Sequence, residues 1–459
     1  MNKNIQKIFL LTLLTLLLIG IASATENQTN TIKEAKPSLK INNDQPTILD
    51  DMNTQPEHKN NKEIRKQQPE NKTSKTTTKT INIKNFQKLY NTLTSNEYDT
   101  LTLNIKNNIT LEDNIRISNE IKKVTINGNG KTINGSNYHR FLDINSNSEV
   151  IINNIKITDC DSYSGGAISN SGLLTITKST LYNNTAEENG GAIYNSGNLT
   201  IIDSLLYNNN ANHGGVVYNN WNGNTTITKC TLKDNIAEDY GGTTYNEGNF
   251  TFKSSILYNN IAYSGGAIYN YEGLLIINNN KLYDNNATNG GALYNYQNTT
   301  ITNSTLYNNN ATNGGALYNY QNTTITNSTL YNNNATCGGA LYNSWDGNTT
   351  ITKCTLKDNI AEEKGGAIDN KGKIILKQST INNNIAKGTN NEGNGGAINN
   401  DKNLTIIRCT LNNNIAEDMG GAISNKNDGN STIIQSTLLN NTATSYGGSS
   451  ATSNSLSLL

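Results

Sequence analysis

The sequence predicts an all-β fold: a single-stranded right-handed parallel β-helix of about fifteen coils with a short N-terminal capping helix. Three observations support this fold class. A Gly-Gly doublet recurs at a nearly constant step, the residues between doublets alternate between apolar and polar, and two series of asparagines keep their register in successive repeats. A period of roughly 20 to 50 residues is typical of solenoids, because one repeat cannot bury a core alone and neighbouring repeats must stack.

The Gly-Gly doublet marks the period. Successive doublets are separated by 24 to 30 residues. They begin at Gly165, Gly190, Gly214, Gly241, Gly265, Gly290, Gly314, Gly338, Gly365, Gly395, Gly420 and Gly447. Residues 290–312 recur letter for letter at residues 314–336. Copying a whole coil lengthens a rod without disturbing a unique site, so the duplication favours a repeated surface over a single catalytic centre.

The residues between doublets have the rhythm of β-strands. Residues 198–210 and 298–310 alternate apolar and polar side chains, are rich in Thr, Ile and Leu, and are interrupted by clusters of Asn. This pattern predicts short strands separated by turns rather than helices. We expect three short strands in each coil. Extra residues that lengthen the period are expected mostly just before the glycines, at the corner that tolerates insertion.

Two asparagine series are expected to stack into columns. The first comprises Asn170, Asn195, Asn219, Asn246, Asn270, Asn295, Asn319, Asn343, Asn370, Asn400 and Asn425. The second comprises Asn184, Asn209, Asn235, Asn260, Asn285, Asn309, Asn333, Asn359, Asn384, Asn414 and Asn441, with Cys160 at the same position in the first coil. Asparagine tolerates left-handed corners, and stacked side-chain amides can hydrogen-bond along a column.

The residues before the first doublet are expected to close one end of the helix. Residues 83–93 place Phe86, Leu89, Tyr90 and Leu93 at helical spacing. A small helix here would cover the open strand edges of the first coil. The following residues supply about three less regular coils.

Composition divides the chain into five regions. Lys3 and Lys7 precede a short apolar run that ends in Ala-Ser-Ala, which predicts a signal peptide rather than a membrane-spanning helix. The alternative is an uncleaved N-terminal anchor, and we expect no further transmembrane segment. All four prolines lie in the next zone, whose polar composition predicts a disordered spacer. The predicted regions are the signal peptide 1–24, the polar spacer 25–80, the cap and irregular coils 81–164, the regular repeats 165–448, and a short Ser-rich tail 449–459.

The repeat resembles a known family at its Gly-Gly-Ala-Ile element. This element occurs at residues 165–168, 190–193, 265–268, 365–368, 395–398 and 420–423, each followed by a spaced Asn. It resembles the repeats of chlamydial polymorphic outer-membrane proteins and, more closely, those of adhesin-like surface proteins of methanogenic archaea, over about residues 81–448. Leu replaces the Phe of the chlamydial pattern, as at Leu306 and Leu330. The resemblance implies a β-helix of the pectin lyase-like kind and an adhesin-like role.

Two tyrosine columns are expected on the outer surface, because side chains that follow an inward Ile or Leu point outward. The candidate ligand-binding column is Tyr194, Tyr218, Tyr245, Tyr269, Tyr294, Tyr318 and Tyr342. A second column contains Tyr182, Tyr207, Lys233, Tyr258, Tyr283, Tyr307 and Tyr331. One hypothesis is a ribbon of ring faces that binds sugars or a protein surface. The other is that the aromatic ladders only stabilise stacked strands.

No metal site, cofactor or nucleic-acid partner is expected. The formal net charge is zero, and Lys and Arg form no basic stripe. Acidic pairs precede four doublets, at residues 187–188, 238–239, 362–363 and 417–418, where solvated turns are favoured over calcium sites. Cys230, Cys354 and Cys409 share a register at least two coils apart, so buried free thiols are expected. Nineteen glycosylation sequons occur, and we expect modification at a minority of them.

These features predict an exported, non-catalytic, adhesin-like protein that is secreted or held at the cell surface. Its expected partners are glycans or proteins of other cells, and its oligomeric state is left open. One alternative is a passive structural rod of the envelope. The other is a polysaccharide lyase or hydrolase, for which Asp159 and Asp161, with His213 two coils away, are the best candidates.

Overall fold

A computed structural model describes residues 78–388, 393–448, 450–452 and 456–458. They belong to one compact unit, Thr73–Leu459. The predicted signal peptide and nearly all of the predicted spacer lie outside the described residues. None of the helices in the described ranges has the length and apolar character needed to cross a bilayer.

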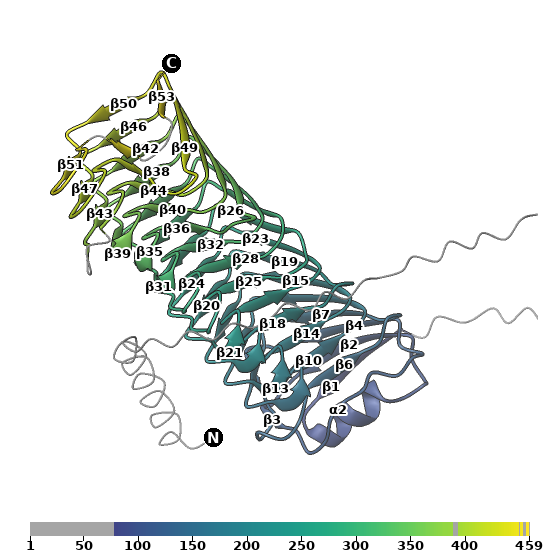
Figure 1. The fold of residues 1–459 in the computed structure, drawn as a ribbon. Coiled ribbons are helices and arrows are strands. Elements are labelled where there is room, and N and C mark those ends of the chain that lie inside the picture. Colours follow the sequence, from purple (N-terminus) through teal and green to yellow (C-terminus); the bar gives the residue numbers. More distant parts are fainter. Residues whose placement is uncertain (1–77, 389–392, 449, 453–455, 459) are drawn as a thin grey trace, which may run out of the picture. The chain divides into compact units, whose positions relative to one another are not determined.

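The described strands form a parallel β-solenoid (Figure 1). Each strand pairs in parallel with its counterpart one coil away, as Leu173–Thr177 pairs with Asn198–Ile202. Three long sheets, here called A, B and C, therefore run along the solenoid. The predicted parallel β-helix is confirmed, and the fourteen described strands of sheet B correspond to about fourteen coils rather than fifteen. The right-handed sense stays a prediction.

Sheet A holds the longest strands and begins each coil. Its strands are β1 (Thr78–Ile83), β2 (Thr100–Ile105), β4 (Lys123–Asn127), β7 (Glu149–Asn153), β11 (Leu173–Thr177), β15 (Asn198–Ile202), β19 (Asn224–Thr228), β23 (Asn249–Lys253), β26 (Leu275–Asn278), β29 (Thr299–Thr302), β33 (Asn322–Thr326), β37 (Asn348–Thr352), β41 (Lys373–Lys377), β45 (Asn403–Ile407), β49 (Asn430–Ile434) and β53 (Leu456–Leu458).

Sheet B follows sheet A after a corner that is two residues long from β7 onward. Its strands are β3 (Ile109–Thr110), β5 (Thr132–Asn134), β8 (Lys156–Thr158), β12 (Thr180–Tyr182), β16 (Leu205–Tyr207), β20 (Thr231–Lys233), β24 (Ile256–Tyr258), β27 (Lys281–Tyr283), β30 (Thr305–Tyr307), β34 (Thr329–Tyr331), β38 (Thr355–Lys357), β42 (Thr380–Asn382), β46 (Thr410–Asn412) and β50 (Thr437–Leu439).

Sheet C follows the glycine doublet and closes each coil. Its strands are β6 (Leu142–Ile144), β10 (Ile168–Asn170), β14 (Ile193–Asn195), β18 (Val217–Asn219), β22 (Thr244–Asn246), β25 (Ile268–Asn270), β28 (Leu293–Asn295), β32 (Leu317–Asn319), β36 (Leu341–Asn343), β40 (Ile368–Asn370), β44 (Ile398–Asn400), β48 (Ile423–Asn425) and β52 (Ser450–Thr452).

A fourth short segment, which we call segment D, lies between sheet B and the glycine doublet. This differs from the three strands expected in each coil. Its strands are β9 (Asp161–Ser164), β13 (Thr185–Asn189), β17 (Asn210–His213), β21 (Ile236–Tyr240), β31 (Asn310–Asn313), β35 (Asn334–Cys337), β39 (Ile360–Lys364), β43 (Ile385–Ala386), β47 (Ile415–Ala416) and β51 (Thr442–Ala443). Single β-bridges continue it between β21 and β31. The sequence pattern did not predict this fourth strand, because the Asn, Ala and Glu residues here do not alternate between polar and apolar.

The core runs the length of the solenoid and is built from one stripe per sheet. In one coil, Leu199 and Ile201 of sheet A, Leu206 of sheet B and Val217 of sheet C are at most 1% exposed. They belong to one continuous cluster that extends from Ile83 to Ile433. Alternate residues of each strand therefore point outward, where they form columns along the surface.

The helix predicted near residue 86 is α2 (Phe86–Leu93). Asn85 caps its N-terminus by accepting a hydrogen bond from the backbone N–H of Lys88 at 3.0 Å. Phe86, Leu89 and Leu93 are buried in the core cluster. Its role as a cap stays a prediction.

Left-handed residues form the corners, but they are not the predicted asparagines. Gly290 has φ 63°, and a Cβ on the second glycine, Gly291, would lie 2.2 Å from the carbonyl oxygen of Gly315 in the next coil. Only glycine fits this doublet. At the corner after sheet B, the left-handed residue is Asn308, one position before the predicted Asn309.

The asparagines instead form two buried ladders, so the second part of that prediction is confirmed. In the series after sheet B, the Nδ2 of Asn285 donates to the Oδ1 of Asn309 at 3.0 Å, and Asn309 repeats the bond to Asn333. In the series at the end of sheet C, Asn295 donates to Asn319 at 2.9 Å. Stacking places each amide one coil from the next, which is why the same residue recurs.

Candidate functional site

The predicted tyrosine column lies on the outer side of sheet C. Tyr194 pairs in register with Tyr218, and the pairing continues through Tyr245, Tyr269, Tyr294 and onward. Tyr318 and Tyr342 complete the column. The structure thus brings all seven predicted residues together, each one coil from the next.

The rings of this column stack on one another. Successive ring centroids are separated by 4.7 to 5.4 Å, and the interplanar angles are 7 to 21°. The ring faces therefore cover each other. The expected ribbon of open ring faces is wrong for the interior of the column, which presents ring edges and hydroxyl ends to a partner.

Further aromatic side chains flank the column. On the segment D side, the Tyr240 ring lies 4.6 Å from that of Tyr269, and the His213 ring lies 5.2 Å from that of Tyr240. On the corner that leads to sheet A, Tyr296 and Tyr320 stack at 4.6 Å. The flanking rings widen the column into a continuous aromatic surface, called here the sheet C face.

Two exposed tryptophans lie on the same corner and were not predicted. Trp221 is 69% exposed and Trp345 is 61% exposed. They occupy equivalent positions in corners that are two residues longer than their neighbours, so the extra residues are not confined to the position before the glycines. The signal that could have revealed them is the near-repeat of residues 218–238 at residues 342–362, each copy with one Trp.

Burial keeps the tyrosine hydroxyls of the column protonated. It raises the pKa of Tyr218, Tyr245, Tyr269 and Tyr294 well above the ordinary value of 10. Tyr245 and Tyr269 are the most enclosed, at 8% exposure each. The hydroxyls therefore stay protonated at neutral and mildly alkaline pH. Tyr218 donates to the Glu247 carboxylate, and Tyr194 accepts from the Nδ2 of Asn220 at 3.1 Å.

A buried polar cluster continues the column beyond Tyr342. The next residue in register is Asp369, which is fully buried and accepts a hydrogen bond from Asn399 at 2.7 Å. Lys371 lies 3.6 Å from Asp369 and 2.5 Å from Asp401. Burial raises the pKa of Asp369 despite the nearby ammonium group. The aromatic surface therefore ends at an ion-paired cluster.

The second predicted column lies on the outer side of sheet B. Tyr258, Tyr283, Tyr307 and Tyr331 stack at 4.7 to 4.9 Å with nearly parallel rings. Lys233 interrupts the column, with its Nζ 5.6 Å from the Tyr207 ring centroid and 5.8 Å from that of Tyr258. Both predicted columns are thus real aromatic ladders.

The other candidate residues form no common site in the structure. Asp161 begins β9, whereas His213 ends β17 and is in register with Asn189 and Ser164. The candidate catalytic residues therefore lie at opposite ends of segment D. No group of three or more His, Cys, Asp or Glu side chains in the described ranges could hold a metal ion.

The cysteines are free thiols, as predicted. Cys160, Cys230, Cys354 and Cys409 are buried, and Cys337 is partly exposed. Burial raises the pKa of Cys230 and Cys354 to about 11, so both remain protonated. Each donates to the carbonyl oxygen two residues earlier in the chain, at 3.2 Å. They replace the serine that makes the same contact in neighbouring coils, as Ser204 does at 2.8 Å.

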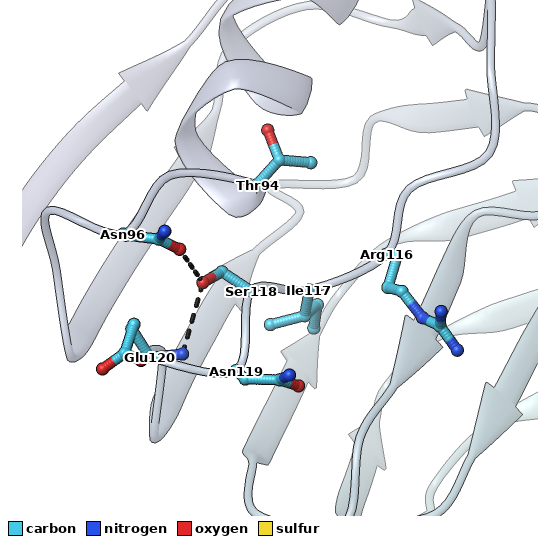
Figure 2. A pocket seen from close by; sticks show the side chains of 7 residues that line it. All are labelled: Thr94, Asn96, Arg116, Ile117, Ser118, Asn119 and Glu120. Atoms are coloured by element: carbon cyan, nitrogen blue, oxygen red, sulfur yellow. Dashed lines mark hydrogen bonds between the residues drawn. The ribbon is translucent and has the colours of Figure 1, made fainter.

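A shallow, open hollow of about 330 Å³ lies beside the C-terminal end of α2 (Figure 2). Inside it, Ser118 donates to Asn96 at 2.6 Å and accepts from the backbone N–H of Glu120 at 3.2 Å. These bonds pair polar groups of the lining residues with one another. The lining residues are Thr94, Asn96, Arg116, Ile117, Ser118, Asn119 and Glu120.

Comparison with known families places part of one coil in a described repeat. Residues 178–196 match the model of the Chlamydia polymorphic membrane protein repeat. They run from the corner after β11 to the residue after β14, so the match spans β12, the segment D strand β13, the glycine doublet and β14. No curated protein shows significant similarity to the chain. The chain is therefore a parallel β-helix repeat protein that contains a repeat similar to those of polymorphic membrane proteins.

Proposed function

We propose that this chain is an exported, surface-associated or secreted adhesin-like protein that binds glycans or proteins of other cells without catalysis. The sheet C face is the proposed contact surface. The observation that carries this proposal is the gathering of seven column tyrosines, their flanking rings and two exposed tryptophans on one side of the solenoid. Tyr and Trp supply large, rigid contact area with a polar end, and they are enriched where proteins bind partners.

Two further observations support the proposal. The matched repeat belongs, by its description, to membrane proteins of Chlamydia, which favours a location at the cell surface. Residues 290–312 are copied at 314–336 and extend the same face by an identical coil. A surface that is extended by duplicated coils suits multivalent contact with a partner that also has repeated units.

The test compares two variants of the full chain, each of which loses three stacked tyrosine rings from one face. The sheet C triple variant is Tyr294→Ala, Tyr318→Ala and Tyr342→Ala. The sheet B triple variant is Tyr283→Ala, Tyr307→Ala and Tyr331→Ala, which removes a stacked ladder from the same coils. Binding to whole cells and to a glycan array should fall at least tenfold for the first and stay near wild type for the second.

A milder variant controls for the possibility that the triple variant loses binding because it is less stable. Trp221→Ala with Trp345→Ala removes two exposed rings and should leave thermal unfolding unchanged while binding weakens. Equal binding by the wild type and the sheet C triple variant would refute the proposed face. A chain that binds no cell and no glycan would favour the passive rod, and release of reducing ends or unsaturated products from acidic polysaccharides would favour the lyase or hydrolase.

A further inference from the structure

Charge is segregated around the solenoid, although the whole chain is neutral. Residues 185–347 contain ten acidic residues and four lysines. Seven of the acids lie on segment D or on the corner between sheets C and A. These seven are Glu187, Glu188, Glu238, Asp239, Glu247, Glu272 and Asp346. All four lysines lie in or beside the strands of sheets A and B, at positions 229, 233, 253 and 281.

The acids border the aromatic surface on both sides. Glu238 and Asp239 precede Tyr240, whose ring lies 4.6 Å from that of Tyr269. On the other side, Glu247 accepts a hydrogen bond from Tyr218. Asp346 likewise accepts one from Tyr320. These acids cluster in the coils around Tyr245, where no lysine balances them on segment D or on the corner, so the potential over this part of the strip is negative.

The chain itself shows how an ammonium group docks on this corner. The Nζ of Lys402 lies over the Trp345 ring, 5.8 Å from its centroid. Among the described residues, the cation–π contacts include Trp345 but not Trp221, which has the equivalent position five coils earlier. Near Trp221 the next corners carry Glu247 and Glu272 instead of a lysine. Trp221 is 69% exposed, and the equivalent corners of the next two coils carry acids where those after Trp345 carry lysines.

These features indicate which chemical groups a partner would place on this surface. An ammonium or guanidinium group is attracted to an open indole face and to adjacent carboxylates. A neutral sugar polymer gains little here, because the column covers its own ring faces by stacking. The surface combines Tyr and Trp with Asn, Ser and Gly, a composition that suits adaptable contact with protein. From Trp221 to Trp345 it spans five coils, about 24 Å, which an extended peptide of about eight residues covers.

We propose that the sheet C face binds a lysine- or arginine-rich segment of a partner protein, with one cationic side chain over Trp221 on the side where the next two coils carry Glu247 and Glu272. This inference rests on the proposed function and names the partner chemistry for the same face. Electrostatic attraction would raise the rate of association and make the affinity depend on salt.

The experiment measures binding of a fluorescent ten-residue lysine peptide to the full chain. A ten-residue glutamate peptide and an amino-sugar oligomer are the comparison probes. Glu247→Gln with Glu272→Gln should weaken lysine-peptide binding about tenfold, because two charge pairs are lost. The matched control, Asp203→Asn with Asp284→Asn, removes the same charge from other corners and should change binding less than twofold. Trp221→Ala should weaken binding about threefold to fivefold, and Trp345→Ala less.

The outcomes separate this inference from the proposed function. Equal binding of the lysine and glutamate peptides, or equal loss in the control variant, would overturn the inference. Tighter binding of the amino-sugar oligomer would assign the face to a cationic glycan and also overturn it. If cell binding depends on the sheet C triple variant but not on salt or on Glu247 and Glu272, the proposed function stands and the cationic partner is wrong.

Discussion

The two tyrosine columns share one architecture and differ in their surroundings. Both place one ring per coil on the outer side of a three-residue strand, and both stack rings at about the strand spacing. On sheet C, flanking rings and corners enclose the column, and burial raises the pKa of Tyr294 and Tyr342 well above 10. On sheet B, the rise at Tyr283 and Tyr307 is smaller.

The charges around the columns differ as well. Lys233 and Lys357 fill the sheet B column where a tyrosine is missing, and each lies near the aspartate that follows it, at 3.0 and 3.3 Å. The sheet B column thus neutralises its own charges. The sheet C face carries carboxylates without lysines from residue 185 to residue 347. The comparison teaches that two ladders of the same architecture can differ in enclosure and in the balance of charge around them.

The largest expected difference between the columns is in stability. We expect the sheet C triple variant to lose about 6 kcal/mol of unfolding free energy and the sheet B triple variant about 3 kcal/mol, because the sheet C rings bury more surface. Chemical denaturation followed by circular dichroism measures both. Equal losses would mean that enclosure does not distinguish the two columns.

The sequence predicted those features that every coil must repeat. The asparagine ladders were visible because a column of bonded amides needs an asparagine at the same register of every coil, as at Asn309 and Asn333. The direction of the tyrosine rings was not visible, because register gives the position of Cβ but not the side-chain torsions. Trp221 escaped notice because it lies in a corner, outside the alternating strands.

The ion-paired cluster could not be predicted for a different reason. Lys371 and Asp401 are 30 residues apart, in the coil with the longest insertion. Strand register pairs Asn370 with Asn400, so Lys371 and Asp401 follow at equivalent positions one coil apart. The residue at this corner position changes from coil to coil, so no repeated pattern indicates that these two are paired and largely buried.

Alkaline pH should affect the sheet C column more than the sheet B column. A tyrosine whose folded pKa is raised contributes stability that is complete below the unfolded pKa of about 10 and is lost as the pH rises above it. We expect each sheet C ring to cost about 1 kcal/mol between about pH 9 and pH 11. Tyr294→Phe with Tyr318→Phe and Tyr342→Phe should reduce that loss. The corresponding sheet B phenylalanine variant should reduce it less, and an identical pH dependence in both variants would contradict the difference in burial.

The smallest expected effect comes from repairing the interruption of the sheet B column. Lys233→Tyr would place a ring between Tyr207 and Tyr258 and create two stacked pairs. It would also remove the cation–π contacts and the ion pair of Lys233 with Asp234, which is partly exposed. Stacking should outweigh these weak contacts, so we expect a gain of about 0.5 kcal/mol by chemical denaturation. A loss of stability would show that the cation–π contacts and the ion pair of Lys233 stabilise the sheet B column more than a stacked ring would.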